Sequence, residues 1–145
     1  MNIDYICRTH DGRTAIISNH RTYMTDHSVT YVLDHILLIK LATTHGRLSA
    51  TRKLTKWKRK VPIYVDRNHV FMVLKGLRCD ESLIVNVKNV VSIEKKDGDS
   101  GIITFSKGHV LVFVSWPILC RQWERASVLI PLIERLENAF IGKTR

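Results

Sequence analysis

The residues with the clearest chemical potential form a dense basic run near the middle of the chain. From Arg52 to Lys60 the sequence reads Arg-Lys-Leu-Thr-Lys-Trp-Lys-Arg-Lys. Between His35 and Val65 lie eight of the 23 basic residues and none of the 13 acidic ones, so this basic segment, residues 35–65, carries most of the net charge of +10. A concentrated cluster of this kind favours a polyanion partner, because neutralised phosphates release their counterions.

Trp57 and His45 are two further side chains of the basic segment that carry binding chemistry. An indole among lysines and arginines can stack on a nucleic-acid base, and it can equally anchor the segment to the rest of the domain. His45 lies beside Gly46 and Arg47 and can reach a phosphate, although an isolated histidine is more often exposed or satisfied within the fold. Both interpretations stay open for Trp57, and His45 is left out of the predicted site.

Side chains suited to catalysis or metal binding do not cluster along the sequence. The glycine-rich phosphate loops, the His-Glu-x-x-His zinc pattern, the Gly-x-Ser-x-Gly nucleophile motif and Cys-x-x-Cys are all missing. Asp97 and Asp99 faintly resemble a calcium loop, but the later ligands are missing, so we predict a hairpin turn there. We therefore predict a protein that is not an enzyme, with no catalytic residues, no metal and no cofactor.

Length and composition predict one folded domain, residues 1–145. With 45% apolar and 25% charged residues, the chain has enough material for a hydrophobic core. Its longest uncharged stretch, Gly108 to Cys120, is shorter than the roughly 20 residues that cross a membrane, and the first residues lack the features of a secretory signal. We expect a cytoplasmic protein whose three cysteines, Cys7, Cys79 and Cys120, are reduced and mostly buried.

Turn residues and β-branched runs predict a domain that is mostly antiparallel β-sheet. Residues 3–7 and 14–17 flank Asp11-Gly12 and predict a hairpin, and residues 61–65 and 70–74 predict a second pair of strands. Pro62 fits a strand end or a sheet edge, because it lacks an amide donor. Residues 83–87, 90–93, 102–105 and 110–114 predict an antiparallel meander. The segment from Ser28 to Ala42 fits either a strand or a helix.

The C-terminal part of the chain predicts two helices. Ser115-Trp116-Pro117 supplies a capping residue followed by a proline in the first turn, so a helix should begin there, with Trp116 and Trp123 in the core. A second helix should open near Pro131 and end at Gly142. We therefore expect an α+β fold, with mostly antiparallel β-strands and two C-terminal helices.

Several short motifs between Gly46 and Ala126 follow one another in an order that carries a family resemblance. They are Ser49, Arg52 and Lys53 in the basic segment; Lys60-Val-Pro-Ile-Tyr-Val-Asp66, followed by Phe71; Ile103-Thr-Phe-Ser-Lys-Gly108; and Gln122-Trp-Glu-Arg-Ala126. This ordered set resembles the competence transcription factor ComK family, DNA-binding activators of Gram-positive bacteria.

The resemblance implies a cytoplasmic, nucleoid-associated regulator that binds AT-rich promoter boxes as a homodimer or higher homo-oligomer. It further implies minor-groove binding, DNA bending, activation of DNA-uptake genes and contact with the transcription machinery. The narrow minor groove of A-tracts attracts arginine and lysine, which suits the basic segment. The family tends to carry cysteine and aromatic residues where this chain has Ala42-Thr43-Thr44-His45, and its longer members continue into a tail that docks a proteolytic adaptor. Groove contacts at residues 42–45 and control by that adaptor are therefore not carried over.

Our first hypothesis is that the basic segment binds double-stranded, AT-rich DNA. The predicted DNA-binding residues are Arg47, Ser49, Arg52, Lys53, Lys56, Trp57, Lys58, Arg59 and Lys60. Two alternatives stay open. Residues 82–90 and 105–108 are similar to the strand pattern of the LytTR type of DNA-binding domain, which would also make the chain a DNA-binding regulator. In another class of function, the basic segment docks an acidic protein or an anionic membrane surface.

Overall fold

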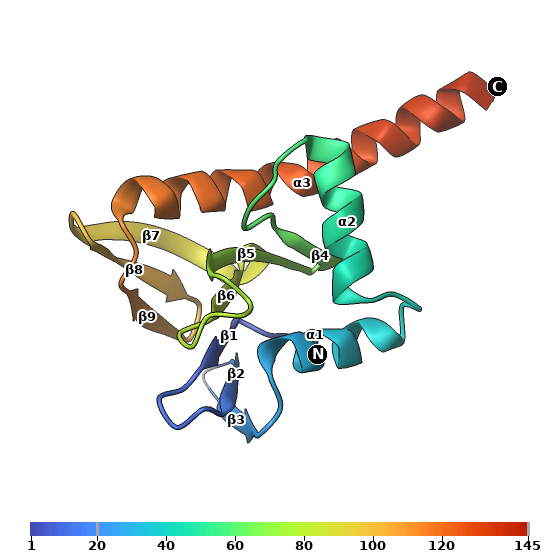
Figure 1. Cartoon of the computed structure of the whole chain (residues 1–145). Coiled ribbons are helices and arrows are strands. Elements are labelled where there is room, and N and C mark those ends of the chain that lie inside the picture. Colours follow the sequence, from blue (N-terminus) through green and yellow to red (C-terminus); the bar gives the residue numbers. More distant parts are fainter. Residues whose placement is uncertain (20, 145) are drawn as a thin grey trace.

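A computed structural model of the chain describes residues 1–19 and 21–144 (Figure 1). Its elements are, in order, β1 (Tyr5–Arg8), β2 (Thr14–Ser18), β3 (Arg21–Thr25), α1 (Val29–Leu38), α2 (Thr44–Thr55), β4 (Ile63–Asp66), β5 (His69–Lys75), β6 (Leu83–Asn86), the 3-10 turn η1 (Val87–Asn89), β7 (Val90–Asp97), β8 (Ser100–Phe105), β9 (Gly108–Val112) and α3 (Trp116–Thr144). The strands pair antiparallel, and the α+β class predicted from the sequence is confirmed.

The larger sheet has six strands in the order β3-β2-β1-β6-β5-β4. The two predicted hairpins, β1–β2 and β4–β5, are confirmed, and Pro62 stands just before β4, at the edge of the sheet. The expected position of residues 83–87 in a meander is wrong, because β6 lies between β1 and β5. Two adjacent residues of β6, Ile84 and Val85, are both buried, each in a different core cluster. A strand that is buried on both faces lies inside a sheet that is covered on both sides.

The smaller sheet has the order β7-β8-β9 and contains the rest of the predicted meander. Its first turn is the hairpin expected at Asp97 and Asp99, where the Asp97 Oδ1 atom accepts hydrogen bonds from the Asp99 amide and the Ser100 hydroxyl, each 2.9 Å long. These bonds within the turn account for the aspartate spacing that faintly resembles a calcium loop.

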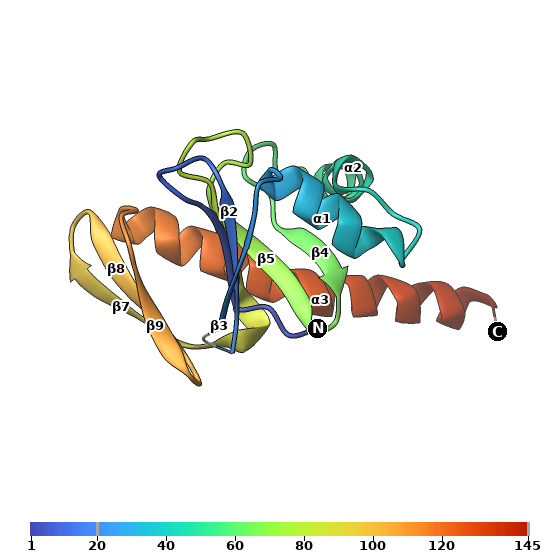
Figure 2. The same cartoon turned by 90° about the horizontal axis from the view of Figure 1, so that it is seen from below.

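Two core clusters lie on opposite faces of the large sheet, and β5 contributes to both. Val70, Met72 and Leu74 belong to the cluster shared with α3 and the small sheet, whereas Phe71 and Val73 belong to the cluster shared with α1. Figure 2 shows α1 and α2 on one side of β4 and β5, and α3 on the other. The segment between α2 and β4 therefore leads from the layer of α1 and α2 into the large sheet, and α3 lies on the opposite side of that sheet.

Helix α1 settles the ambiguous segment at residues 28–42 in favour of a helix. The Ser28 hydroxyl accepts a hydrogen bond from the Tyr31 amide and caps its first turn. Val29, Leu33 and Leu37 are buried at helical spacing against the large sheet. The burial therefore follows one face of a helix and does not alternate as it would in a half-buried strand.

Helix α3 is one continuous element of 29 residues, which corrects the prediction of two C-terminal helices. It begins at Trp116 as expected, but it passes through Pro131 and continues beyond Gly142. Pro131 and Ser127 are both exposed, so water can satisfy the carbonyl that the proline leaves without its helical amide partner. The last turns of α3 extend away from the sheets in both views (Figures 1 and 2). No helix among the described residues is long and apolar enough to cross a membrane.

Three smaller expectations meet different outcomes. Trp116 and Trp123 are partly buried against the core, as predicted. The cysteines are free, but the expectation that most are buried is wrong: Cys79 is exposed, and Cys7 and Cys120 are only partly buried. Partial burial raises the pKa of the Cys7 thiol, which keeps it protonated and unreactive.

Strand β3 was not predicted, because four of its five residues are exposed and no apolar alternation marks it.

Candidate nucleic-acid interface

The first half of the basic segment forms helix α2, which the sequence did not reveal. The Thr43 side chain caps the helix by accepting a hydrogen bond of 3.0 Å from the Gly46 amide. The Asp34 carboxylate of α1 accepts a 2.7 Å bond from the Thr44 amide. A negative charge at a helix N-terminus also interacts favourably with the helix dipole. Helix α1 therefore fixes the start of α2.

The inner face of α2 is made mostly of short polar residues. Thr44 and Thr51 are buried, and Leu48 packs against the core cluster beneath α1. The Thr51 hydroxyl donates to the Arg47 carbonyl at 2.9 Å, so this buried hydroxyl is satisfied within the helix. The Arg47 guanidinium lies 5.5 Å from the centre of the Tyr64 ring on β4. Arg47 thus contributes to seating the helix as well as to its charge.

The outer face of α2 presents both cations and small side chains to solvent. Arg52 and Lys53 are exposed, as are Gly46, Ser49 and Ala50 on the same helix. Small residues let a helix backbone come close to a partner, while long basic side chains reach around it. The outer face of α2 is therefore shaped for close contact with an extended anionic surface.

After α2, residues 56–60 form an exposed turn with unusual backbone angles. Lys56, at the end of the helix, has a φ of +65°, and Lys60 has a φ of +48°. Within residues 1–19 and 21–144, the other non-glycine residues with positive φ are Asn19 and Leu41. Three of these four positions fall in the basic segment. Strained backbone of this kind concentrates at functional sites, since folding alone would favour glycine there.

Helix α3 holds the turn at residues 56–60 in place. Gln122 is only 2% exposed, and its Nε2 atom donates to the carbonyls of Lys60 at 2.7 Å and Val73 at 2.8 Å. The Arg125 guanidinium lies 5.0 Å from the centre of the Trp57 ring and donates to the Arg59 carbonyl at 3.3 Å. Of the two interpretations of Trp57, these contacts support the anchor, because the indole is partly buried beneath Arg125.

The charges of this region have no carboxylate partners among the described residues. The ion pairs among the described residues are Arg13–Asp11, Arg67–Glu134 and His69–Asp66. None of them involves a lysine or arginine of the basic segment. We call the following exposed set the basic surface: Ser49, Arg52, Lys53, Lys56, Lys58, Arg59 and Lys60. Because these cations are exposed and form no ion pair within the described chain, a polyanion can neutralise them without breaking an internal ion pair.

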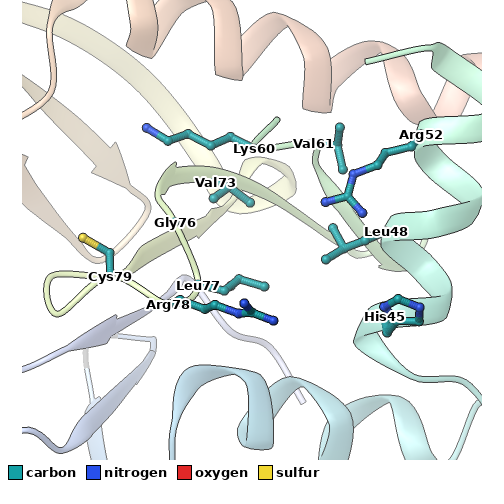
Figure 3. Close-up of a pocket in the computed structure, with 10 residues that line it drawn as sticks. All are labelled: His45, Leu48, Arg52, Lys60, Val61, Val73, Gly76, Leu77, Arg78 and Cys79. Carbon is teal, nitrogen blue, oxygen red and sulfur yellow. The ribbon is translucent and has the colours of Figure 1, made fainter. Parts of the chain in front are cut away.

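A pocket of about 420 Å³ opens beside the basic surface, between α2 and the connection from β5 to β6 (Figure 3). Leu48, Val61, Val73 and Leu77 supply its apolar walls. The basic residues that line it are His45, Arg52, Lys60 and Arg78. Arg52 therefore belongs both to the basic surface and to this pocket, while its Nε atom donates to the Lys58 carbonyl at 3.1 Å.

An apolar tip, residues 38–41, precedes α2. Leu38, Ile39 and Leu41 have exposed fractions of 62%, 80% and 95%, far more than apolar residues usually show. Leu41 also takes a left-handed φ of +54° in the turn that ends α1, where glycine is the common residue. Both features cost stability, so the tip is another candidate contact surface at the edge of the basic segment.

The structure gathers seven of the nine predicted DNA-binding residues on the basic surface and turns two inward. Arg47 faces Tyr64, and Trp57 faces α3. Sequence reasoning missed Arg78, which no local pattern marks, and it did not assign Arg125 to the site. The motif Gln122-Trp-Glu-Arg-Ala126 did signal importance, and the structure assigns its Gln122 and Arg125 to holding the basic turn. The part of the chain that the structure describes contains no group of three side chains placed to hold a metal ion.

The comparisons with known proteins bear on nearly the whole chain. A family model described as ComK protein matches residues 5–137, a range that contains all the strands, α1, α2 and most of α3. No curated protein matches the sequence. Among solved structures, the chain is similar to the LytTr DNA-binding domain of a response regulator from Bacillus cereus, with 16% identity, 91% of this chain and 81% of that chain covered, and a TM-score of 0.36. A TM-score that low carries no argument about fold or function.

Proposed function

The chain belongs to the ComK protein family, and from this premise we propose that it is a non-enzymatic, DNA-binding transcription regulator. Its target in this proposal is AT-rich promoter DNA, bound largely in the minor groove by a homodimer or higher homo-oligomer in the cytoplasm, on the nucleoid. Binding there bends the DNA, brings in the transcription machinery and activates competence genes for DNA uptake.

The observation that carries the proposal is the basic surface itself. Its six lysine and arginine side chains lie together on α2 and the following turn, exposed and without described carboxylate partners. A narrow A-tract minor groove has an enhanced negative potential that attracts such side chains without a base code. The small residues Gly46, Ser49 and Ala50 leave room for the DNA backbone to approach α2.

The test is fluorescence anisotropy with AT-rich and GC-rich duplexes of equal length, titrated across salt. We expect the AT-rich duplex to bind more tightly near physiological salt. The double variant Arg52→Ala/Lys53→Ala should bind more weakly and lose about 0.9 from the salt slope for each phosphate contact removed. Lys95→Ala/Lys96→Ala, which removes the same charge from exposed positions on β7, is the matched control and should bind as the wild type does.

Equal affinities of the wild type and the Arg52/Lys53 variant would refute the site. Equal binding of the two duplexes would refute the AT preference while leaving a general DNA-binding surface.

The apolar tip supports a second candidate function, docking on an anionic membrane surface. Leu38, Ile39 and Leu41 stand exposed beside the basic segment, and apolar insertion combined with lysines and arginines is how peripheral proteins bind acidic lipids. Sedimentation with vesicles of phosphatidylserine and phosphatidylcholine decides between the two. Vesicle binding that falls in a Leu41→Ser variant, with no preference between duplexes, would replace the DNA proposal.

A further inference from the structure

The pocket beside α2 combines basic side chains among its lining residues with an aliphatic interior. Arg52, Lys60 and Arg78 line it, and within the described chain none of the three forms an ion pair. None of the ten lining residues is acidic. Figure 3 shows the guanidinium groups of Arg52 and Arg78 and the ring of His45 around the opening. Unpaired cations around a concave space form a site for an anionic group, and arginine suits a carboxylate or a phosphate.

The interior indicates what the anion is attached to. The side chains of Leu48, Val61, Val73 and Leu77 offer contact area but no hydrogen-bonding groups. The lining includes no Phe, Tyr or Trp, and its one ring is the imidazole of His45 at the rim. A DNA phosphate would engage the rim and leave this apolar surface uncovered. A volume of about 420 Å³ lies within the range of sites for small organic ligands.

We infer that this pocket binds a small amphipathic anion, with a phosphate or carboxylate head at the arginines and an aliphatic body against the leucines and valines. The binding itself does not depend on the DNA-binding proposal. One consequence does rest on that proposed function: because Arg52 belongs to both surfaces, the bound anion competes for a DNA-contacting side chain. Ligand and DNA therefore weaken each other's binding by the same factor.

Gly76 offers a way to block the pocket without touching its cations. It lines the pocket, its φ lies outside the left-handed region, and a Cβ atom added to it would meet no heavy atom within 4 Å. Gly76→Leu therefore adds an aliphatic side chain in open space at the pocket wall. Gly98→Leu is the matched control, because Gly98 is equally unobstructed but lies in the β7–β8 turn. Arg78→Gln removes a rim cation that is outside the basic surface.

The experiment is isothermal titration calorimetry on the full chain and these variants, with butyl phosphate, octyl phosphate below its micelle concentration, and inorganic phosphate. We expect saturable octyl phosphate binding that is tighter than butyl phosphate binding, by up to about fourfold for each further methylene buried. Gly76→Leu should weaken octyl phosphate binding by about tenfold or more, roughly the loss of two buried methylenes. Arg78→Gln should weaken it as well, and Gly98→Leu should leave it unchanged.

Three results would overturn the inference: no saturable binding, equal affinity for all three phosphates, or equal octyl phosphate affinity in wild type and Gly76→Leu. Equal affinity for the three phosphates would mean that the cations attract any anion and that the apolar walls take no part.

DNA anisotropy in the presence of octyl phosphate tests the coupling separately. Octyl phosphate should weaken AT-rich duplex binding by the wild type but not by Gly76→Leu, and an unchanged wild type would overturn the competition. If the wild type bound no DNA at all, the proposed function would fall while the calorimetric result still decided the pocket.

Discussion

Replacing Lys56 by glycine separates the contribution of this residue to DNA binding from its cost to folding. Lys56 ends α2 with a φ of +65°, and its amide donates to the Arg52 carbonyl at 2.9 Å, a bond that glycine retains. A left-handed conformation costs a non-glycine residue about 1–2 kcal/mol, and glycine avoids this cost. The greater freedom of glycine in the unfolded chain lowers the unfolding free energy by about 0.4–1 kcal/mol, which offsets part of the gain. The net expectation for Lys56→Gly is a gain of about 0.5–1 kcal/mol in unfolding free energy, or about 2 °C in Tm.

The same change should weaken DNA binding. One lost phosphate contact lowers the salt slope by about 0.9, and extrapolation from 1 M salt gives about a fivefold loss of affinity near 0.15 M salt. Denaturant unfolding and duplex anisotropy on the same preparations measure the two effects. Lys56→Gln removes the charge but keeps the strained backbone, so it should lose affinity without gaining stability.

Asn19→Gly is the control for strain alone, since Asn19 has a φ of +55° but lies outside the basic segment. It should leave DNA affinity unchanged. The reasoning fails if Lys56→Gly binds DNA with wild-type affinity and salt slope, or if it is less stable than the wild type.

Two further changes test the packing behind the basic surface and the charge at the end of β4. Gln122→Leu should lower the unfolding free energy by about 2–4 kcal/mol, because it leaves the Lys60 and Val73 carbonyls without their donor. Urea unfolding measures this loss, and a loss below about 1 kcal/mol would contradict the prediction. At Asp66, burial raises the carboxyl pKa, but hydrogen bonds from His69 and Asn68 outweigh it, and the net pKa lies below the ordinary 3.8. That contribution to stability is present above the ordinary value and is lost as pH falls through the lower folded value, so Asp66→Asn should flatten the decline of stability measured below about pH 4. An unchanged acid profile in Asp66→Asn would show that the carboxyl does not take part.

Local signals in the sequence were sufficient where neighbouring segments pair with each other. The β1–β2, β4–β5 and β7–β8 hairpins follow from turn residues between apolar runs. The position of β6 depends instead on pairing with β1, almost eighty residues away, and the sequence pattern predicted it as part of a meander. Long-range pairing of this kind leaves little trace in local spacing.

The basic segment shows a similar division. Its cations could be identified from the sequence, but α2 could not, because its inner face is built from threonines and one leucine instead of a regular apolar stripe. The anchors Gln122 and Arg125 lie more than sixty residues from the Lys60 and Arg59 carbonyls that they bind in the turn. Which cations face outward depends on these anchors, so local sequence could name the candidates without orienting them.

The bonds from α3 to the turn at residues 56–60 also determine when the basic surface becomes ordered during synthesis. Residues 56–60 leave the ribosome well before Gln122, and until Gln122 is made the Lys60 and Val73 carbonyls lack the side chain that ties them together. Domains complete their folding only when such distant partners meet. A nascent chain therefore carries all the cations of the basic surface before it can hold them in one arrangement. Under the DNA-binding proposal, ordered contact with DNA therefore begins only after α3 has left the ribosome, and an incomplete chain cannot hold its cations in the arrangement that the proposal requires.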